Sequence, residues 1–105
     1  MKVIEHNKLV RDKIPKIIEA SGKQAVVYKE HWDQLLTYLK SKLQEELNEY
    51  KGNGDIEELA DLVEVIYAIL HNQGVSLTEF EKLREEKISK RGSFKEGFVL
   101  VKVVE

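Results

Sequence analysis

Apolar residues in the middle of the chain recur at the spacing of an amphipathic helix. From His31 to Tyr50 they fall at steps of three and four, which is the helical repeat. The segment from Lys51 to Gly54 ends this helix, and Asp55 can cap a second one that runs over Ile56–Gln73 and stops at Gly74. The pattern predicts two long helices joined by a tight turn.

Further helices are predicted on both sides of this pair. Asp12 can cap a helix that ends at Ala20 and has Pro15 in its first turn. Ser76, followed three residues later by Glu79, forms a capping-box pattern that opens another long helix. We therefore expect three or four helices in all.

Two short segments have the composition of β-strands. Gln24–Tyr28 and Phe98–Val104 are both rich in β-branched residues. We expect them to pair, because a lone exposed strand is an aggregation hazard. The predicted fold is mainly α, an antiparallel helical bundle with a minor two-stranded β element, in a single domain over residues 1–105.

Composition excludes several classes of protein. The chain has 105 residues and no cysteine, which excludes disulfides, a thiolate nucleophile and Cys-based metal sites. Its apolar runs are short, so we predict no membrane-spanning helix, no signal peptide, no membrane partner and a cytoplasmic location. Seventeen Lys and Arg against 19 Asp and Glu give a formal charge of −2, so we expect no nucleic-acid partner. A core this small favours association of subunits.

Acidic residues interrupt the apolar stripe of both central helices. At about 100° per residue, Glu46 lies about 300° and Glu49 about 240° from Leu43, inside the stripe and at its border. Glu58 and Asp61 occupy similar positions on the second helix. Each helix thus carries an acidic pair spaced i, i+3 on the side that faces the other helix.

The tight turn is expected to bring the two pairs together. Residues equally far from the turn lie at one height in an antiparallel hairpin, so four carboxylates converge, while Glu45 should point away. Such carboxylates repel and are costly to desolvate, and a divalent cation relieves both effects. Oxygen ligands without His or Cys suit Mg²⁺, with Mn²⁺ as the alternative, and predict metal-assisted phosphoryl chemistry. Either pair alone would be typical of a solvated helix face.

The same residues resemble a known family. EELNE at residues 45–49, followed by ELAD at 58–61, is similar to the ExxE and ExxD motifs of the all-α nucleoside triphosphate pyrophosphohydrolases, the MazG-like superfamily. NKLVRDKIP at 7–15, and Lys87 with RGSF at 91–94 and Gly97, resemble small MazG-like proteins labelled phosphoribosyl-ATP pyrophosphohydrolase-like. The resemblance covers the chain from Asn7 to about Gly97.

This resemblance implies a bundle of the all-α NTP pyrophosphatase type that forms a homodimer or homotetramer. It implies a Mg²⁺-dependent enzyme that cleaves a nucleoside triphosphate, or a related nucleotide, between the α and β phosphates to the monophosphate and pyrophosphate, in nucleotide-pool house-cleaning. The metal ligands and catalytic residues would be Glu46, Glu49, Glu58 and Asp61. True phosphoribosyl-ATP enzymes carry Tyr–His after the second motif, where this chain has Leu62–Val63, which argues against that substrate.

Phosphate oxygens that no metal covers need cations beside them. Several basic residues flank apolar anchors, and arginine can hold phosphate bidentately. Cations near helix ends can equally compensate the helix dipole or stay solvated. Asn7 can bind a base or sugar edge, or simply cap a helix. The candidate substrate-binding residues are Asn7, Lys8, Arg11, Lys13, Lys87 and Arg91.

A second class of function competes with the enzyme. A non-catalytic helical oligomerisation or regulatory module would use the acidic cluster to hold a structural cation. Trp32 and Tyr28 are expected in the core rather than on a nucleobase, because aromatic side chains bury large apolar areas. The histidines are too widely separated in sequence to predict a metal site.

Overall fold

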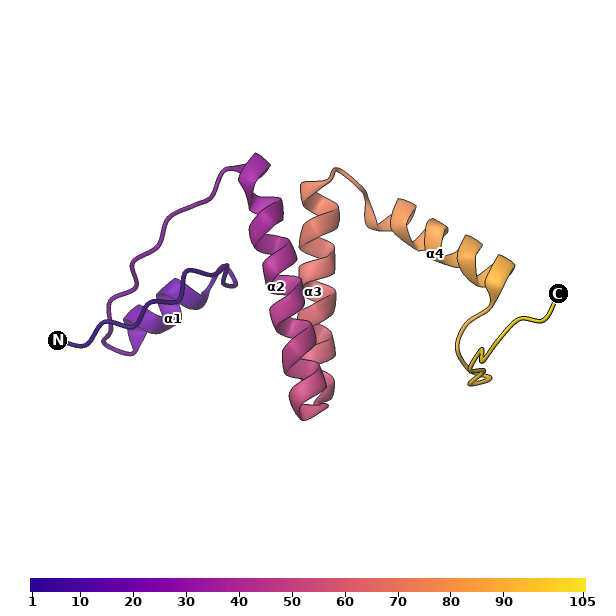
Figure 1. Ribbon diagram of the computed structural model, residues 1–105. Helices are drawn as coiled ribbons and strands as arrows, with labels where there is room; N and C mark the ends of the chain where they lie inside the picture. Colours follow the sequence, from indigo (N-terminus) through magenta and orange to yellow (C-terminus); the bar gives the residue numbers. More distant parts are fainter. The chain divides into compact units, whose positions relative to one another are not determined.

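The computed structural model describes residues 1–105 and contains four α-helices (Figure 1). Their bounds are Ile14–Ala20 for α1, Trp32–Asn53 for α2, Ile56–Asn72 for α3 and Leu77–Arg91 for α4. The chain divides into two compact units, Met1–Gly74 and Val75–Glu105. The mainly helical fold predicted from the hydrophobic repeat is confirmed.

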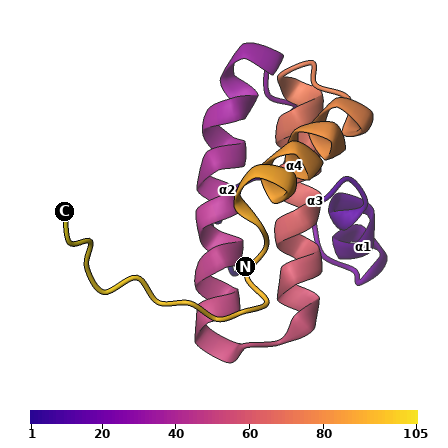
Figure 2. The ribbon, with the colours of Figure 1, turned by 90° about the vertical axis from the view of Figure 1, so that its right-hand side faces the viewer.

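Helices α2 and α3 form an antiparallel hairpin. They lie side by side, and only Gly54 and Asp55 connect them (Figures 1 and 2). Gly54 has a φ of 70°, in the left-handed region that favours glycine, and its N–H donates to the carbonyl oxygen of Tyr50 at 2.7 Å. This turn fixes which residues of the two helices share one height.

The hairpin buries two apolar and two polar side chains. Leu39 and Val65 are the buried apolar residues, and Glu46 and Asn72 are the buried polar ones. Asn72 Nδ2 donates to the carbonyl oxygen of Trp32 at 3.0 Å, which ties the end of α3 to the start of α2. Asn72 is thus satisfied by the fold itself, as buried polar groups usually are.

The first helix begins later than the sequence predicts. Lys13, rather than Asp12, holds the N-cap position of α1, and no side chain caps this end. Pro15 stands in the first turn, as predicted, where its missing N–H costs nothing. Only one further turn follows before the helix ends at Ala20.

The caps of the other helices agree with the sequence in position but only partly in bonding. Asp55 holds the N-cap position of α3 without a side-chain cap bond, and instead its N–H donates to Asn53 Oδ1 at 2.9 Å. Ser76 does cap α4, because its Oγ accepts the Glu79 N–H at 3.1 Å. Of the two hydrogen bonds of the predicted capping box, the one from the Glu79 N–H to Ser76 Oγ is therefore confirmed.

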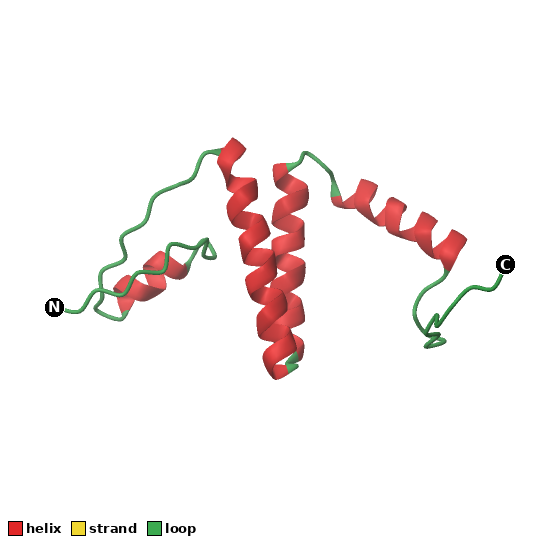
Figure 3. Ribbon diagram, in the orientation of Figure 1, coloured by secondary structure: helices red, strands yellow, loops and turns green.

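The structure contains no β-strand (Figure 3). Gln24–Tyr28 and Phe98–Val104, which we predicted to pair, are loop segments that belong to different units. A strand needs a neighbour that takes up its N–H and C=O groups, and neither unit contains a strand with which its own segment could pair. The predicted two-stranded element is absent for that reason.

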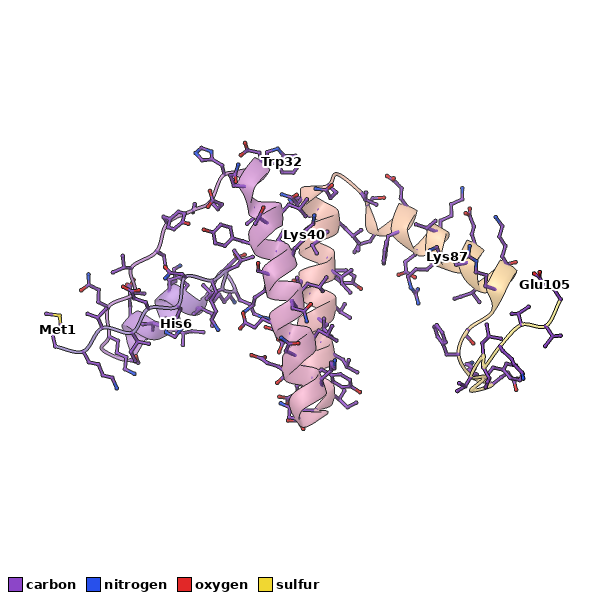
Figure 4. The ribbon with its side chains drawn as sticks, in the orientation of Figure 1. Met1, His6, Trp32, Lys40, Lys87 and Glu105 are labelled. Carbon is purple, nitrogen blue, oxygen red and sulfur yellow. The ribbon has the colours of Figure 1, made fainter.

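Trp32 and Tyr28 are exposed rather than in the core. Trp32 is the first residue of α2, at the end of the hairpin opposite the turn (Figure 4). Tyr28 lies in the loop before it, and its hydroxyl is 2.9 Å from that of Tyr38. Both side chains are more than 60% exposed, so the expected burial does not occur.

The second unit consists of α4 and the segment that follows it. No residue of α4 is buried, and Gly92, with a φ of 82°, follows its end. A helix of this length is marginal on its own in water, so its stability depends on packing. No helix of the chain is both long and apolar enough to cross a membrane.

Candidate metal centre

Three carboxylates from two helices converge on the hairpin. Glu46 of α2 and Glu58 and Asp61 of α3 each offer an oxygen, and the three oxygens lie within 4.8 Å of one another. The i, i+3 spacing puts Glu58 and Asp61 on one face of α3, and the tight turn sets Glu46 opposite them. The structure thus brings together three of the four predicted metal ligands.

A second group of carboxylates overlaps the first. Oxygens of Glu45, Glu46 and Glu49, all on α2, also lie within 4.8 Å of one another. Because Glu46 belongs to both groups, the five carboxylates form one continuous cluster, which we call the acidic cluster. Glu45, which we expected to point away, belongs to no group with a carboxylate of α3, but the N-terminal segment places Lys8 against its side of α2.

Glu46 is the most buried member of the acidic cluster, with 6% of its surface exposed. Its Oε1 lies 3.4 Å from Lys42 Nζ, whereas its Oε2 is buried and has no hydrogen-bond partner. Glu58 Oε2 is likewise buried without a partner, although its Oε1 accepts from Asn53 Nδ2 at 3.2 Å. A buried carboxylate oxygen without a partner is costly, so two in one cluster fit the ligands of a cation.

Three basic side chains offset part of this charge. Lys8 Nζ is 2.9 Å and Lys42 Nζ 3.4 Å from Glu45 Oε1, and Arg11 Nη2 is 2.6 Å from Asp61 Oδ1. Five carboxylates therefore face three cations, and the excess charge is negative. An oxygen-only donor set of this charge suits a hard divalent ion such as Mg²⁺ or Mn²⁺.

The charges shift several pKa values in opposite directions. The hydrogen bond with Lys8, helped by Lys42, lowers the pKa of Glu45, and the same hydrogen bond raises the pKa of Lys8. Repulsion from Glu46, followed by desolvation and a hydrogen bond with Glu58, raises the pKa of Glu49. Glu49 therefore takes up a proton more readily than an isolated glutamate.

The N-terminal segment carries three of the predicted substrate-binding residues to the hairpin. Lys8 contacts α2 and Arg11 contacts α3, so the segment spans both helices at the acidic cluster. Asn7 has a φ of 48°, and among residues other than glycine it alone has a positive φ. Asn tolerates this conformation better than most residues, which lets the chain turn just before Lys8.

The other predicted cations lie outside this network of contacts. Lys13 is exposed at the start of α1 and forms no ion pair. Lys87 and Arg91 are exposed on α4, in the second unit (Figure 4 labels Lys87), and their part in substrate binding stays a prediction. Lys42 was missed, although its i+3 and i+4 spacing to Glu45 and Glu46 is a signal that the sequence already contains.

Comparisons with protein-family models, with curated proteins and with solved structures find no match to this chain. The likeness to MazG-like proteins therefore rests on the motifs alone. The acidic cluster and the cations around it are the features of the chain that bear on function.

Proposed function

We propose that this chain is a Mg²⁺-dependent nucleoside triphosphate pyrophosphohydrolase, with Mn²⁺ able to replace Mg²⁺. The observation that carries the proposal is the pair of buried oxygens, Glu46 Oε2 and Glu58 Oε2, that have no partner within a cluster of carboxylates. A merely solvated acidic face would leave such oxygens open to water. The motifs that resemble the MazG-like superfamily add the reaction type.

The residues divide into those that would hold metal and those that would hold phosphate. Glu46, Glu49, Glu58 and Asp61 are the proposed metal ligands. A bound Mg²⁺ would neutralise charge on the polyphosphate and make water more acidic. Lys8 and Arg11 stand at the edge of the acidic cluster, and their cationic groups can move from carboxylate to phosphate oxygens. Lys13, Lys87 and Arg91 remain further candidates for the same task.

In the proposed reaction, one water molecule is consumed. Its oxygen bonds to the α-phosphorus, and the bond from that phosphorus to the bridging oxygen breaks, so that pyrophosphate leaves and the nucleoside monophosphate remains. We assign the proton of the water to Glu49. Its exposed position lets it pass this proton on to solvent.

Association of subunits belongs to the same proposal. Several apolar side chains of the hairpin are more than a third exposed although they lie on its helices, and a homodimer or homotetramer would cover them and complete a helical bundle. These residues are Leu47, Leu59, Val63 and Tyr67. A cytoplasmic location and a role in cleaning the nucleotide pool complete the proposal.

The exposed apolar residues also favour a second candidate, a non-catalytic oligomerisation or regulatory module. In that case the acidic cluster would hold a structural cation and no nucleotide would turn over. The two candidates agree on metal binding and on assembly. They differ only in turnover, so an activity measurement separates them.

The experiment is a panel of nucleoside triphosphates incubated with the chain and Mg²⁺, followed by measurement of pyrophosphate. Glu46→Gln and Asp61→Asn should abolish release, whereas Glu64→Gln, an exposed carboxylate on α3, should retain it. Release that persists in Glu46→Gln would contradict the assigned site. No release from any nucleotide, with Mn²⁺ binding intact, would favour the regulatory module.

A further inference from the structure

A pocket lies beside the acidic cluster, between the N-terminal segment and α2. Its volume is about 130 Å³. Asn7 and Leu9 form one wall, and Thr37, Tyr38 and Ser41 of α2 form the other. The sequence motifs pointed to Asn7 but gave no reason to select the three residues of α2.

The pocket and the acidic cluster form one continuous surface. Tyr38, Ser41 and Glu45 follow one another at steps of three and four along α2, so they lie on one face of the helix. From Tyr38 to Glu45 this face runs for about 10 Å. Lys8 and Lys42, which also line the pocket, both contact Glu45 and mark the boundary between pocket and acidic cluster. A ligand in the pocket would therefore extend its phosphates toward the carboxylates.

The walls of the pocket offer hydrogen bonds that nothing in the chain uses. The side chains of Asn7, Thr37 and Ser41 make no hydrogen bond within the protein. The Asn7 amide can donate and accept at once, as the edge of a nucleobase requires. Tyr38 has its hydroxyl 2.9 Å from that of Tyr28, which fixes its ring as a surface on which a base can stack.

We infer that this pocket binds the base of a pyrimidine nucleotide. The inference rests on the proposed function, because it takes the phosphates to lie at the acidic cluster. A cavity of about 150 Å³ accommodates a single benzene ring. The pocket is of this size and opens to solvent, so one six-membered ring fits between its walls, whereas the second ring of a purine would extend beyond them. Leu9 covers the ring on its apolar side, while Asn7, Thr37 and Ser41 bond its edge.

The first test measures binding without turnover, with Mg²⁺ present so that the acidic cluster does not repel the nucleotide phosphate. The ¹⁵N-labelled full-length chain is titrated with CMP, UMP and AMP, and amide shifts are followed by NMR. We expect CMP or UMP to shift the amides of Asn7, Thr37 and Ser41 much more than AMP does. Thr37→Val should weaken this binding about five- to tenfold through the lost hydrogen bond, whereas Thr78→Val, at an exposed threonine of α4, should not. Equal shifts with AMP, or none with CMP and UMP, would overturn the inference.

The second test separates the pocket from the proposed function. Thr37→Val should raise KM for pyrimidine triphosphates and leave kcat nearly unchanged, because base binding is the same in the ground and transition states. If purine triphosphates turn over equally well and Thr37→Val leaves KM unchanged, the pocket assignment fails while the proposed function stands. If no triphosphate turns over but CMP still binds at Thr37, the proposed function fails and the pocket stands.

Discussion

Arg11 and Asp61, fifty residues apart in sequence, form an ion pair in which Arg11 Nη2 lies 2.6 Å from Asp61 Oδ1. Asp61, a proposed metal ligand, is thus paired with Arg11, which we propose to bind phosphate. The Arg11 side chain is 55% exposed and that of Asp61 37%, so the pair is worth only about 0.2–1 kcal/mol. Such a pair can give way when a divalent ion and a phosphate replace the two partners.

Replacing Arg11 should therefore separate metal affinity from turnover. Arg11→Gln frees Asp61, so we expect Mn²⁺ to bind about two- to fivefold more tightly, as the energy of an exposed pair allows. Triphosphate hydrolysis should fall, because the guanidinium that holds phosphate is gone. Calorimetry with Mn²⁺ and a pyrophosphate assay measure the two effects.

The matched control is Arg84→Gln on α4. Arg84 Nη1 is also 2.6 Å from a carboxylate oxygen, that of Glu81, and this pair too is exposed. We expect neither Mn²⁺ affinity nor hydrolysis to change. Weaker Mn²⁺ binding in Arg11→Gln would show that the guanidinium does not compete with the metal.

Glu46 makes the metal-free protein less stable than it could be. Its Oε2 is buried without a partner, so Glu46→Gln removes a buried charge and should leave the metal-free protein at least as stable as the parent. The stabilisation by Mg²⁺ should disappear, and in the parent it amounts to about 2.7 kcal/mol when free Mg²⁺ is 100 times its Kd.

Thermal unfolding with and without Mg²⁺ measures both parts of this prediction. Glu64→Gln should keep the full shift of Tm with Mg²⁺, because Glu64 is exposed and outside the acidic cluster. A Glu46→Gln protein that Mg²⁺ still stabilises as much as the parent would exclude Glu46 as a ligand.

The sequence predicted the hairpin well because its signals are local. The apolar repeat of α2 and α3 is long, and Gly54 stops the first helix where a left-handed residue is needed. The convergence of Glu46, Glu58 and Asp61 followed from the turn and the helical repeat. These features depend on one or two adjacent elements, which periodicity describes directly.

Features that depend on distant segments were not predictable in this way. The helical repeat gives the angle of Glu45 around its own helix. It does not show that Lys8, 37 residues earlier in the sequence, contacts Glu45. The pocket wall at Thr37 and Tyr38 likewise exists only because Asn7 and Leu9 lie opposite. The loop at Gln24–Tyr28 has the composition of a strand, but pairing requires a neighbour that composition cannot supply.

The ion pair of Lys8 and Glu45 should stabilise the protein only within a window of pH. The pKa of Lys8 is raised above 10.5, so its contribution is present below pH 10.5 and is lost as the pH rises through the folded pKa. The pKa of Glu45 is lowered below 4.5, so its contribution is present above pH 4.5 and is lost as the pH falls through the folded pKa. The ion pair therefore contributes its full stabilisation between about pH 4.5 and pH 10.5.

We expect Lys8→Met to lower the free energy of unfolding by about 0.2–1 kcal/mol across that window, because the pair is partly exposed. The difference from the parent should shrink at both extremes of pH. Chemical denaturation over a pH series measures it. Lys40→Met, an exposed lysine of α2 without an ion pair, should show no such window, and a difference that persists well below pH 4 would count against the pair.

Asn72 should contribute more to stability than any surface amide. It is 4% exposed, and its Nδ2 donates to the Trp32 carbonyl oxygen. Asn72→Ala removes this part-buried hydrogen bond between α2 and α3 and should cost about 0.5–1.5 kcal/mol of unfolding free energy. Asn48→Ala, at an exposed amide bonded to Gln44, should cost much less, and equal costs in urea denaturation would contradict the role of Asn72 at the hairpin end.

Glu49 should titrate above the usual range of a glutamate, and Glu46 should be the main reason. Repulsion from Glu46 is the largest cause of the raised pKa, so Glu46→Gln should lower the pKa of Glu49 toward 4.5. Between pH 4.5 and its folded pKa, Glu49 binds more protons in the folded chain than in the unfolded chain. The metal-free parent should therefore lose stability as the pH rises through this interval, and Glu46→Gln should lose less.

Carboxyl ¹³C NMR of Glu49 over a pH series, in the metal-free parent and in Glu46→Gln, measures the shift directly. Glu64→Gln is the control and should leave the titration of Glu49 unchanged, because Glu64 lies outside the acidic cluster. Mn²⁺ affinity of the parent should fall as the pH drops through the pKa of Glu49, since a proton and a metal compete for the same oxygens. A Glu49 that titrates identically in all three proteins would mean that its carboxylate does not sense Glu46, and the acidic cluster would then be more open than the structure shows.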